Sequence, residues 1–235
     1  MDKYKLIRAR RFILNVIFIL LTQVVYYQAK ASAVELYEYY PIAQGDSWNY
    51  LVSDDGFQEK ICTIMGEESV DNLNTVKISI GENKIIWLIR DADGIKTYKI
   101  FNGDNYQVFT PPKLLLPNNL EIGETKEYSI DSVVYDKNGV KIGKESVKGR
   151  IVLKAIEPIE VRAGKFIDCL NVRMVEDWTE SADSYGTDDV TFWLARNIGI
   201  IKYFSFSVPS QPNEKAEVET QELISATIKG EKIGN

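Results

Sequence analysis

Apolar and polar residues alternate in short runs along most of the chain after Val34, and turn residues separate these runs at intervals of about 8 to 12 positions. In the first run, Trp48, Tyr50 and Val52 alternate with polar residues, which is typical of a strand with one buried face. No window of a dozen residues after Val34 has the 3.6-residue apolar period of an amphipathic helix. The pattern therefore predicts an all-β fold.

The other runs repeat this pattern with turns such as Asp91-Ala92-Asp93-Gly94 between them. We expect strands at 47–53, 57–65, 75–80, 85–89, 95–101, 127–136, 146–156, 166–176, 190–195, 199–206 and 217–228. Prolines interrupt the middle of the chain at 110–112 and 116–119. Because proline cannot donate a ladder hydrogen bond, neither stretch is expected within a central strand, and this interruption is the expected boundary between two halves.

Two motifs occur twice in the same order, once in each half. The first is a glycine five residues before a tyrosine, found as Gly45 with Tyr50 and as Gly123 with Tyr128. The second joins a Trp-Leu-x-Arg strand to a Gly-Ile-x-x-Tyr strand, at 87–98 and at 193–203. The repetition predicts a duplicated antiparallel meander within a single β domain at 34–235, with halves at about 34–110 and 117–235.

One such meander exposes an apolar face that it cannot cover alone. The two halves are therefore expected to share one strongly curved sheet with a common interior. The sequence leaves open whether this sheet forms a half-barrel, a closed barrel or a sandwich.

The first 33 residues have the three parts of a secretory signal peptide, which is expected to be helical. A basic start is followed by an apolar stretch at 12–27 and by the small-residue cleavage motif Ala31-Ser32-Ala33. An uncleaved anchor remains the alternative, since 12–28 is near the shortest span that crosses a bilayer. The leader predicts an extracytoplasmic protein, either periplasmic or secreted to the cell surface, with membrane contact only through the segment before cleavage.

The composition of the chain excludes several kinds of catalytic and metal site and disfavours some partners. The chain contains no histidine, so a Ser-His-Asp triad, a Cys-His dyad and a histidine-ligated zinc or haem each lack an essential part. Removal of the leader, with its six cations and one carboxylate, would change the net charge from −6 to −11. An acidic protein is disfavoured as a partner of nucleic acid or anionic lipid surfaces, which are polyanions. No cofactor or catalytic residue is predicted.

Two cysteines, Cys62 and Cys169, each lie in an apolar, strand-like run. Outside the cytosol a disulfide between them could persist. The alternative is two buried thiols that act as small hydrophobic side chains.

Aromatic residues are the candidate binding groups. An apolar ligand in a β protein would be lined by such side chains, and the candidates are Trp48, Tyr50, Trp87, Trp193 and Tyr203. The alternative is that they fill the core, because the tryptophans that match between the halves indicate equivalent structural positions. Arg90 and Arg196 also match, and each is expected to hydrogen-bond a neighbouring turn.

Carboxylates are concentrated at 176–189, which begins with Glu176 and Asp177. Because Ser, Gly, Thr and Asp cluster there, we expect a solvated hairpin loop. Calcium coordination and a pair of catalytic carboxylates are the alternatives, although the Asp-x-Asp-x-Asp-Gly spacing and metal-site signatures are absent.

Three further motifs carry a resemblance to a known group of proteins. They are Tyr40-Pro41-x-x-x-Gly45-x-x-Trp48-x-Tyr50, Val161-x-Ala163-Gly164-x-Phe166-x-x-Cys169-x-x-Val172 and Phe192-Trp193-x-Ala195-x-x-x-Gly199-x-x-Lys202. Together they resemble a family of secreted bacterial proteins of uncharacterised function. The resemblance implies an exported β protein related in shape to the curved half-barrels of lipoprotein carriers such as LolA, and it supplies no catalytic residues.

The expected function is that of a non-enzymatic envelope or extracellular protein that binds an apolar or lipid-like ligand. One alternative is a structural or protein-interaction module without a small ligand, whose partner would be another envelope protein. The other is a carboxylate-based enzyme that acts on a polysaccharide.

Overall fold

The computed structural model describes residues 33–53, 56–210 and 215–234. The expected signal peptide at 1–33 lies outside the described residues except for its last position. Residues Glu35–Asn235 form one compact unit, and the fold described below is that unit. In the described part, the helical content is one 3-10 helix, η1 (Leu36–Tyr39), and no helix there is long and apolar enough to cross a membrane.

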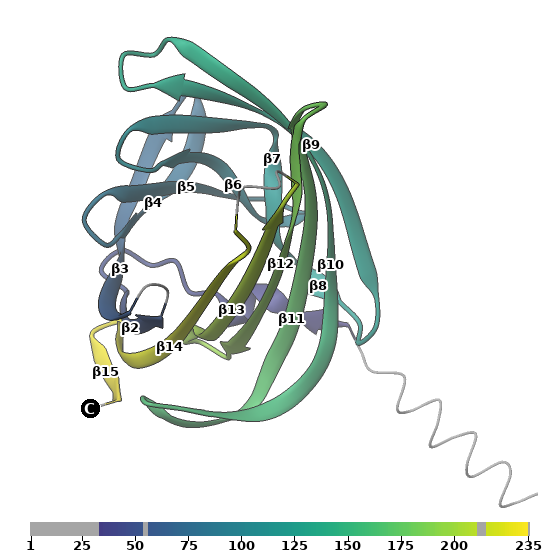
Figure 1. Ribbon diagram of the computed structural model, residues 1–235. Helices are drawn as coiled ribbons and strands as arrows, with labels where there is room; N and C mark the ends of the chain where they lie inside the picture. Colours follow the sequence, from purple (N-terminus) through teal and green to yellow (C-terminus); the bar gives the residue numbers. More distant parts are fainter. Residues whose placement is uncertain (1–32, 54–55, 211–214, 235) are drawn as a thin grey trace, which may run out of the picture. The chain divides into compact units, whose positions relative to one another are not determined.

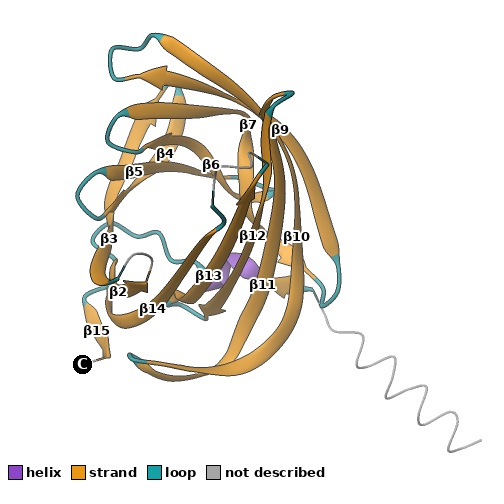
Figure 2. Ribbon diagram, viewed as in Figure 1, coloured by secondary structure: helices purple, strands orange, loops and turns teal. Residues whose placement is uncertain are grey.

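Twelve antiparallel strands form one sheet that closes into a barrel (Figures 1 and 2). The barrel strands are β2 (Ser47–Ser53), β3 (Phe57–Val70), β4 (Leu73–Ile80), β5 (Lys84–Arg90), β6 (Gly94–Phe101), β7 (Asn105–Pro117), β9 (Thr125–Asp136), β10 (Lys141–Val161), β11 (Gly164–Ser181), β12 (Ser184–Ala195), β13 (Gly199–Pro209) and β14 (Glu217–Ile228). Three short strands are β1 (Val34–Glu35), β8 (Asn119–Leu120) and β15 (Glu231–Gly234), and β15 forms a hairpin with β14.

Each strand of the barrel pairs with its neighbour in sequence, and β14 pairs with both β13 and β2. The two halves are therefore the meanders β2–β7 and β9–β14, which meet at β7–β9 and at β14–β2. The all-β prediction is confirmed. Of the three architectures that the sequence left open, the structure has the closed barrel, so the half-barrel implied by the resemblance is not observed.

The prediction for the prolines at 110–112 was wrong, because β7 runs through this stretch and pairs with β6 and β9. The second stretch, 116–119, interrupts the strands as expected, since β7 ends at Pro117. Its ladder with β9 ends at Thr110, and its register with β6 shifts between the partners of Thr97 and Lys99. Pro111 and Pro112 consequently have no ladder partner, and their missing N–H groups cost the sheet nothing.

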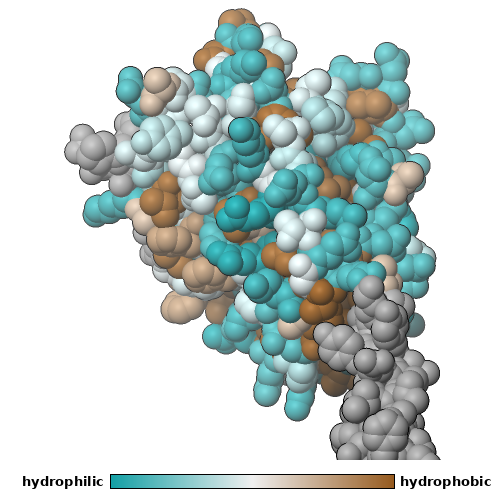
Figure 3. Space-filling view, turned by 90° about the vertical axis from the view of Figure 1, so that its right-hand side faces the viewer, coloured by the Kyte–Doolittle hydropathy of each residue, from teal (hydrophilic) through white to brown (hydrophobic). Residues whose placement is uncertain are grey.

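The barrel interior is the core of the protein. Along β2, Trp48, Tyr50 and Val52 are buried while the residues between them are partly exposed, as the alternation predicted. On the opposite wall, Phe109 and Val147 form a buried cluster with Ile130, and Trp178 packs against it. Large side chains thus fill the interior on the β7–β11 side. In contrast, the outer face on the right of Figure 1 is mostly hydrophilic, with apolar residues in small groups (Figure 3).

The segment from η1 to β2 lies at the end of the barrel that carries the β5–β6 and β12–β13 turns. Leu36 is fully buried, and its amide donates to the carbonyl of Asn118 at 2.8 Å. Asn197, in the β12–β13 turn, donates its amide to the carbonyl of Glu38 at 2.8 Å. Asp46 is also fully buried and accepts the amide of Lys229 at 2.8 Å. These contacts fix the segment against the turns that close this end.

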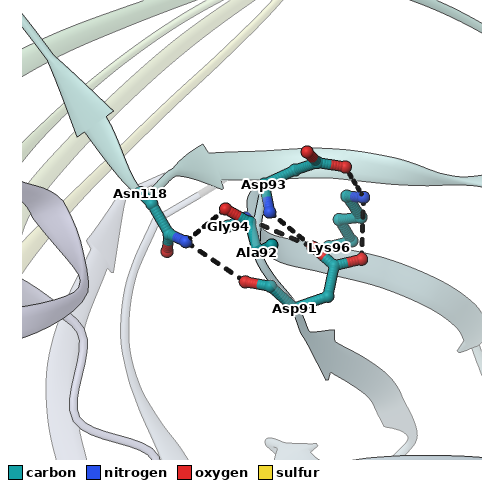
Figure 4. Close-up of polar contacts among 6 residues, drawn as sticks. All are labelled: Asp91, Ala92, Asp93, Gly94, Lys96 and Asn118. Carbon is teal, nitrogen blue, oxygen red and sulfur yellow. Dashed lines mark hydrogen bonds and ion pairs between the residues drawn. The ribbon is translucent and has the colours of Figure 1, made fainter.

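The β5–β6 turn is held by a network of hydrogen bonds and ion pairs (Figure 4). The Asp91 carboxylate accepts the amides of Asp93 at 2.9 Å and Gly94 at 3.3 Å. Lys96 bridges Asp91 and Asp93 with N–O distances of 2.8 and 2.6 Å. The side-chain amide of Asn118 donates to the carbonyl of Asp91 at 3.2 Å and to that of the following residue at 2.6 Å. The turn is therefore tied to the chain that leaves β7.

Candidate functional site

A cavity of about 260 Å³ lies inside the barrel. Its lining comes mainly from β2–β6, β13 and β14, and its apolar members include Trp48, Ile78, Ile80, Ile86, Leu88 and Ile200. Sites for drug-sized ligands usually measure ~300–1,000 Å³, so this cavity suits a smaller molecule. A larger depression of about 590 Å³ lies beside η1 and is lined by Tyr37, Arg90 and Thr75 among others, but it is more open to solvent. The less open and more apolar cavity is the better candidate site.

Strand alternation decides which side chains line the cavity. On β5, Lys84, Ile86 and Leu88 line it, whereas Ile85 and Trp87 between them do not. Successive side chains of a strand point to opposite faces of the sheet. The neighbouring isoleucines Ile85 and Ile86 therefore lie on the outer and inner faces of the same wall.

Two aromatic residues of β2 fix the wall beside the cavity. The indole N–H of Trp48 donates to the carbonyl of Ile198 at 2.5 Å, and the hydroxyl of Tyr50 donates to the carbonyl of Ile200 at 2.8 Å. Both acceptors belong to the start of β13 and its turn, which β14 separates from β2. Burial raises the pKa of Tyr50 well above its usual range, so Tyr50 remains a neutral donor.

Lysines and carboxylates also reach the cavity. Lys60 forms an ion pair with Glu219 at 3.6 Å. Lys84 forms no ion pair with a carboxylate of the described residues, although its side chain lines the same cavity. Burial lowers the pKa of Lys84, and repulsion from Lys60 lowers it further. Glu219 opposes these two effects, although it forms an ion pair with Lys60 and not with Lys84.

A second polar cluster lies within the barrel, on the β7–β11 side. Lys113 forms an ion pair with Glu176 at 3.0 Å, and the Tyr128 hydroxyl also donates to Glu176. The side chain of Glu176 is only 7% exposed, so both partners compensate a nearly buried carboxylate. Burial and the neighbouring carboxylate raise the pKa of Tyr128 far above its ordinary value. This cluster is internally satisfied and offers no free group to a ligand.

The structure brings together only part of the predicted aromatic set. Trp48, Tyr50 and Tyr203 line the cavity. Trp87 and Trp193 do not, and the expectation that they would line one ligand site with Trp48 is corrected. They occupy strand positions between residues that face inward, such as Ile86 and Leu88 around Trp87, so alternation turns them to the outer face.

The two outer tryptophans have equivalent surroundings. Each lies at a register shift, donates its indole N–H to a glutamate two strands away and is stacked by a lysine. For Trp87 these partners are Glu68 and Lys99, the lysine at 5.6 Å from the ring centre. For Trp193 they are Glu157 at 2.8 Å and Lys202 at 5.8 Å. This agrees with what a duplicated meander would produce, and the duplication itself stays a prediction.

The matched arginines also have similar surroundings, but not those expected. Arg90 stacks over the ring of Tyr37 at 4.8 Å, and Arg196 stacks over Tyr39 at 5.2 Å. Arg196 also forms an ion pair with Glu38 at 2.6 Å. Both arginines thus hold η1 against the barrel instead of bonding a neighbouring turn.

The acidic run at 176–189 is not a solvated loop. It forms the end of β11 and the start of β12 around a two-residue turn. Glu176 points into the barrel, whereas Asp177 accepts a hydrogen bond from Thr187 on the exposed face. Because adjacent strand residues face opposite sides, these two carboxylates do not form a catalytic pair. Among the described residues, no group of three or more His, Cys, Asp or Glu could hold a metal ion.

Reasoning from the sequence missed Lys84 and Lys60 as site residues. The signal was present in the period of two, because Lys84 precedes Ile86 and Leu88 at the spacing of one strand face. The strand expected at 85–89 begins one residue too late, so Lys84 falls outside it.

The two cysteines are free in the structure. Cys62 lines the cavity from β3, and Cys169 is buried on β11, five strands away around the wall. Neighbouring strands are ~4.8 Å apart, so this separation is far beyond disulfide range. The structure has the alternative arrangement of two unpaired thiols.

Burial raises the pKa of the Cys62 thiol to about 11, against the opposing effect of Lys60. We expect iodoacetamide to alkylate Cys62 at least about 100-fold more slowly at pH 8 than it alkylates an unstructured cysteine, because the thiolate is the nucleophile. The rate should rise about tenfold per pH unit between pH 7 and 9.5. Mass spectrometry of the Cys169→Ser variant measures it, and a rate that levels off below pH 9 would contradict the raised pKa.

No family model matches this chain, and no curated protein matches it. Three solved structures are similar to it. A candidate lipoprotein from Parabacteroides distasonis is 13% identical, with 79% of this chain and 97% of that chain covered and a TM-score of 0.43. A candidate exported protein with a YmcC-like fold from Bacteroides fragilis is 14% identical, with coverage of 78% and 96% and a TM-score of 0.45. The hypothetical lipoprotein YmcC from Escherichia coli K12 is 10% identical, with coverage of 77% and 87% and a TM-score of 0.42. Similarity at this level does not indicate a shared function.

Proposed function

We propose that this chain is a non-catalytic protein that binds a small apolar or lipid-like ligand inside its barrel. The observation that carries the proposal is the cavity of about 260 Å³ inside the barrel, whose wall is mainly aliphatic and aromatic. Preformed, concave and largely apolar sites with a few polar groups are typical of small-molecule binding. The leader sequence at 1–33 further supports action outside the cytoplasm, in the periplasm or at the cell surface.

The walls of the cavity are well suited to keep it open for a ligand. Hydrogen bonds to the carbonyls of Ile198 and Ile200 hold the side chains of Trp48 and Tyr50 in place, so these rings do not rotate freely into the cavity. The barrel has no free sheet edge among its twelve strands, which also limits rearrangement. A rigid, preformed site binds with a smaller entropic cost than a site that must be ordered.

Two neighbouring isoleucines of β5, Ile86 on the inner face and Ile85 on the outer face, allow a test of the proposal. We expect Ile86→Trp to weaken binding of the uncharged fluorescent probe N-phenyl-1-naphthylamine at least about tenfold, a loss of ~1.4 kcal/mol, because the indole occupies the cavity. Ile85→Trp adds the same side chain to the outer face of the same strand. This control should leave the dissociation constant within about twofold of the wild-type value.

Fluorescence titration measures both variants, and circular dichroism establishes that each is folded. If the wild-type protein fails to bind the probe, or if both tryptophan variants bind it like the wild type, the lumen is not a binding site. Native mass spectrometry of the mature protein supplies an independent readout, since a bound apolar molecule would add its mass.

A protein-interaction module without a small ligand is the second candidate. It is favoured by a row of exposed apolar side chains on the outer face of β13 and β14, made of Phe204, Phe206, Val208 and Val218. Exposed apolar patches of this kind mark contact surfaces in many proteins. An empty, non-binding lumen in a well-folded sample would favour this second function.

A further inference from the structure

We infer that the ligand of the lumen is an amphiphile with an anionic head group, which the ammonium group of Lys84 binds. This inference rests on the proposed function, since it assigns the chemistry of a ligand in the same cavity. It follows from the order of side chains along β5, from the pairing of charges inside the barrel and from the size of the cavity.

Along β5 a charged side chain lies at one end of the cavity wall and apolar side chains follow it. Lys84 is the first residue of the strand, and Ile86 and Leu88 follow it on the same inner face. At ~3.3 Å per residue, Lys84 and Leu88 are separated by about 13 Å along the strand. A molecule with a charged head and an apolar tail matches this order.

The ion pairs of the interior single out Lys84. Lys60 is paired with Glu219 at 3.6 Å, and Lys113 is paired with Glu176 at 3.0 Å. Among the described residues Lys84 has no carboxylate within ion-pair distance, and its exposed side chain lines the cavity. Glu219 attracts the ammonium group from a greater distance, but this carboxylate is itself paired with Lys60. The ammonium group of Lys84 is therefore available for a charge-assisted hydrogen bond to an anionic ligand.

The size of the cavity limits the tail. At about 260 Å³ the cavity is smaller than the ~300–1,000 Å³ that is usual for sites of drug-sized ligands. A single alkyl chain suits this volume better than the two chains of a phospholipid. The class of ligand that fits is a medium-chain carboxylate or an equivalent anionic amphiphile.

Competition with the naphthylamine probe tests the inference. At pH 8 we expect decanoate to bind the wild-type protein about tenfold or more tightly than decan-1-ol, which has the same chain without the charge. Lys84→Met should reduce this preference to within about twofold, because it removes the charge that distinguishes decanoate from decan-1-ol. Lys84→Arg should retain most of the preference, because it keeps the charge.

Lys77→Met is the matched control, since Lys77 lies on the neighbouring strand β4 and stacks on the outer tryptophan Trp87. It should retain the full preference for decanoate. If the probe and decan-1-ol bind but decanoate has no advantage, or if Lys84→Met keeps that advantage, the head-group inference is overturned and the proposed function stands. If the probe and both amphiphiles fail to bind, the proposed function fails as well.

Discussion

Replacement of Gly94 with alanine is expected to lower the free energy of unfolding by about 3 kcal/mol or more, the largest effect that we expect from a single methyl group in this protein. Gly94 is buried at the start of β6 and has a φ of +148°. A Cβ atom at this position would lie 2.1 Å from the carbonyl oxygen of Leu116 and 2.8 Å from the Cα atom of Pro117. Both obstacles are backbone atoms, so the turn or β7 would have to move.

Movement there would also strain the bonds that fix the turn. The side-chain amide of Asn118 donates to the carbonyl of Asp91, and the backbone amide of Asn118 donates to the carbonyl of Asp93 at 2.9 Å. The same residues hold the start of η1, because Leu36 donates to Asn118. The Gly94→Ala substitution should therefore loosen the closed end of the barrel as well as the hairpin.

Thermal and urea unfolding measure this effect. For a domain of this size, 3 kcal/mol corresponds to a fall in Tm of roughly 6–12 °C. Gly164→Ala is the matched control, because Gly164 has a similar φ of +133° but no atom within 4 Å of the added Cβ. If both variants lost the same stability, backbone strain alone would explain the result and the close approach of β6 to β7 would contribute nothing.

The second large effect is expected from Lys113→Met, which should lower the free energy of unfolding by about 3–5 kcal/mol. The substitution keeps most of the length of the side chain but removes the positive charge beside Glu176. Glu176 would then retain only the hydroxyl of Tyr128 as a donor within the barrel. A buried carboxylate without its counter-charge is costly because the low-dielectric interior does not replace its hydration.

Two comparisons isolate the charge. The double variant Lys113→Met/Glu176→Gln removes both charges and keeps an acceptor for Tyr128, so it should regain most of the lost stability. Lys144→Met breaks an exposed pair with Asp131, in which both side chains are more than half exposed, and should cost less than about 1 kcal/mol. Urea unfolding of the three variants checks these values. Equal losses in the single and double variants at 113 and 176 would show that the pair is not the source of the effect.

The strand positions could be predicted well because the signal is local. Alternation and turn residues placed 47–53 and 217–228 within one residue of β2 and β14. The prediction failed where a local rule met a distant partner. The prolines of β7 are tolerated because the ladders on both sides skip Pro111 and Pro112, and no pattern within 110–117 reveals where neighbouring ladders stop.

The acidic run shows the same limit. Its composition is that of a turn, but Glu176 is buried because Lys113 and Tyr128, 63 and 48 positions earlier in the chain, supply its charge and its hydrogen bond. A carboxylate with such partners can occupy a strand inside a barrel. The sequence contains all three residues, but it does not contain their proximity.

For the candidate site, composition excluded histidine chemistry. The aromatic pattern pointed to five residues, of which Trp48, Tyr50 and Tyr203 line the cavity and the other two do not. The alternation of side chains along β5 can be predicted from the sequence, since it depends only on the geometry of one strand. Closure of the sheet into a barrel cannot be predicted in this way, because it depends on the pairing of β14 with both β13 and β2. That pairing decides which strand faces enclose a common space. It turns Lys84 and Leu88 toward this space and leaves Trp87 and Trp193 outside, because a residue's surroundings depend on strands far away in the chain.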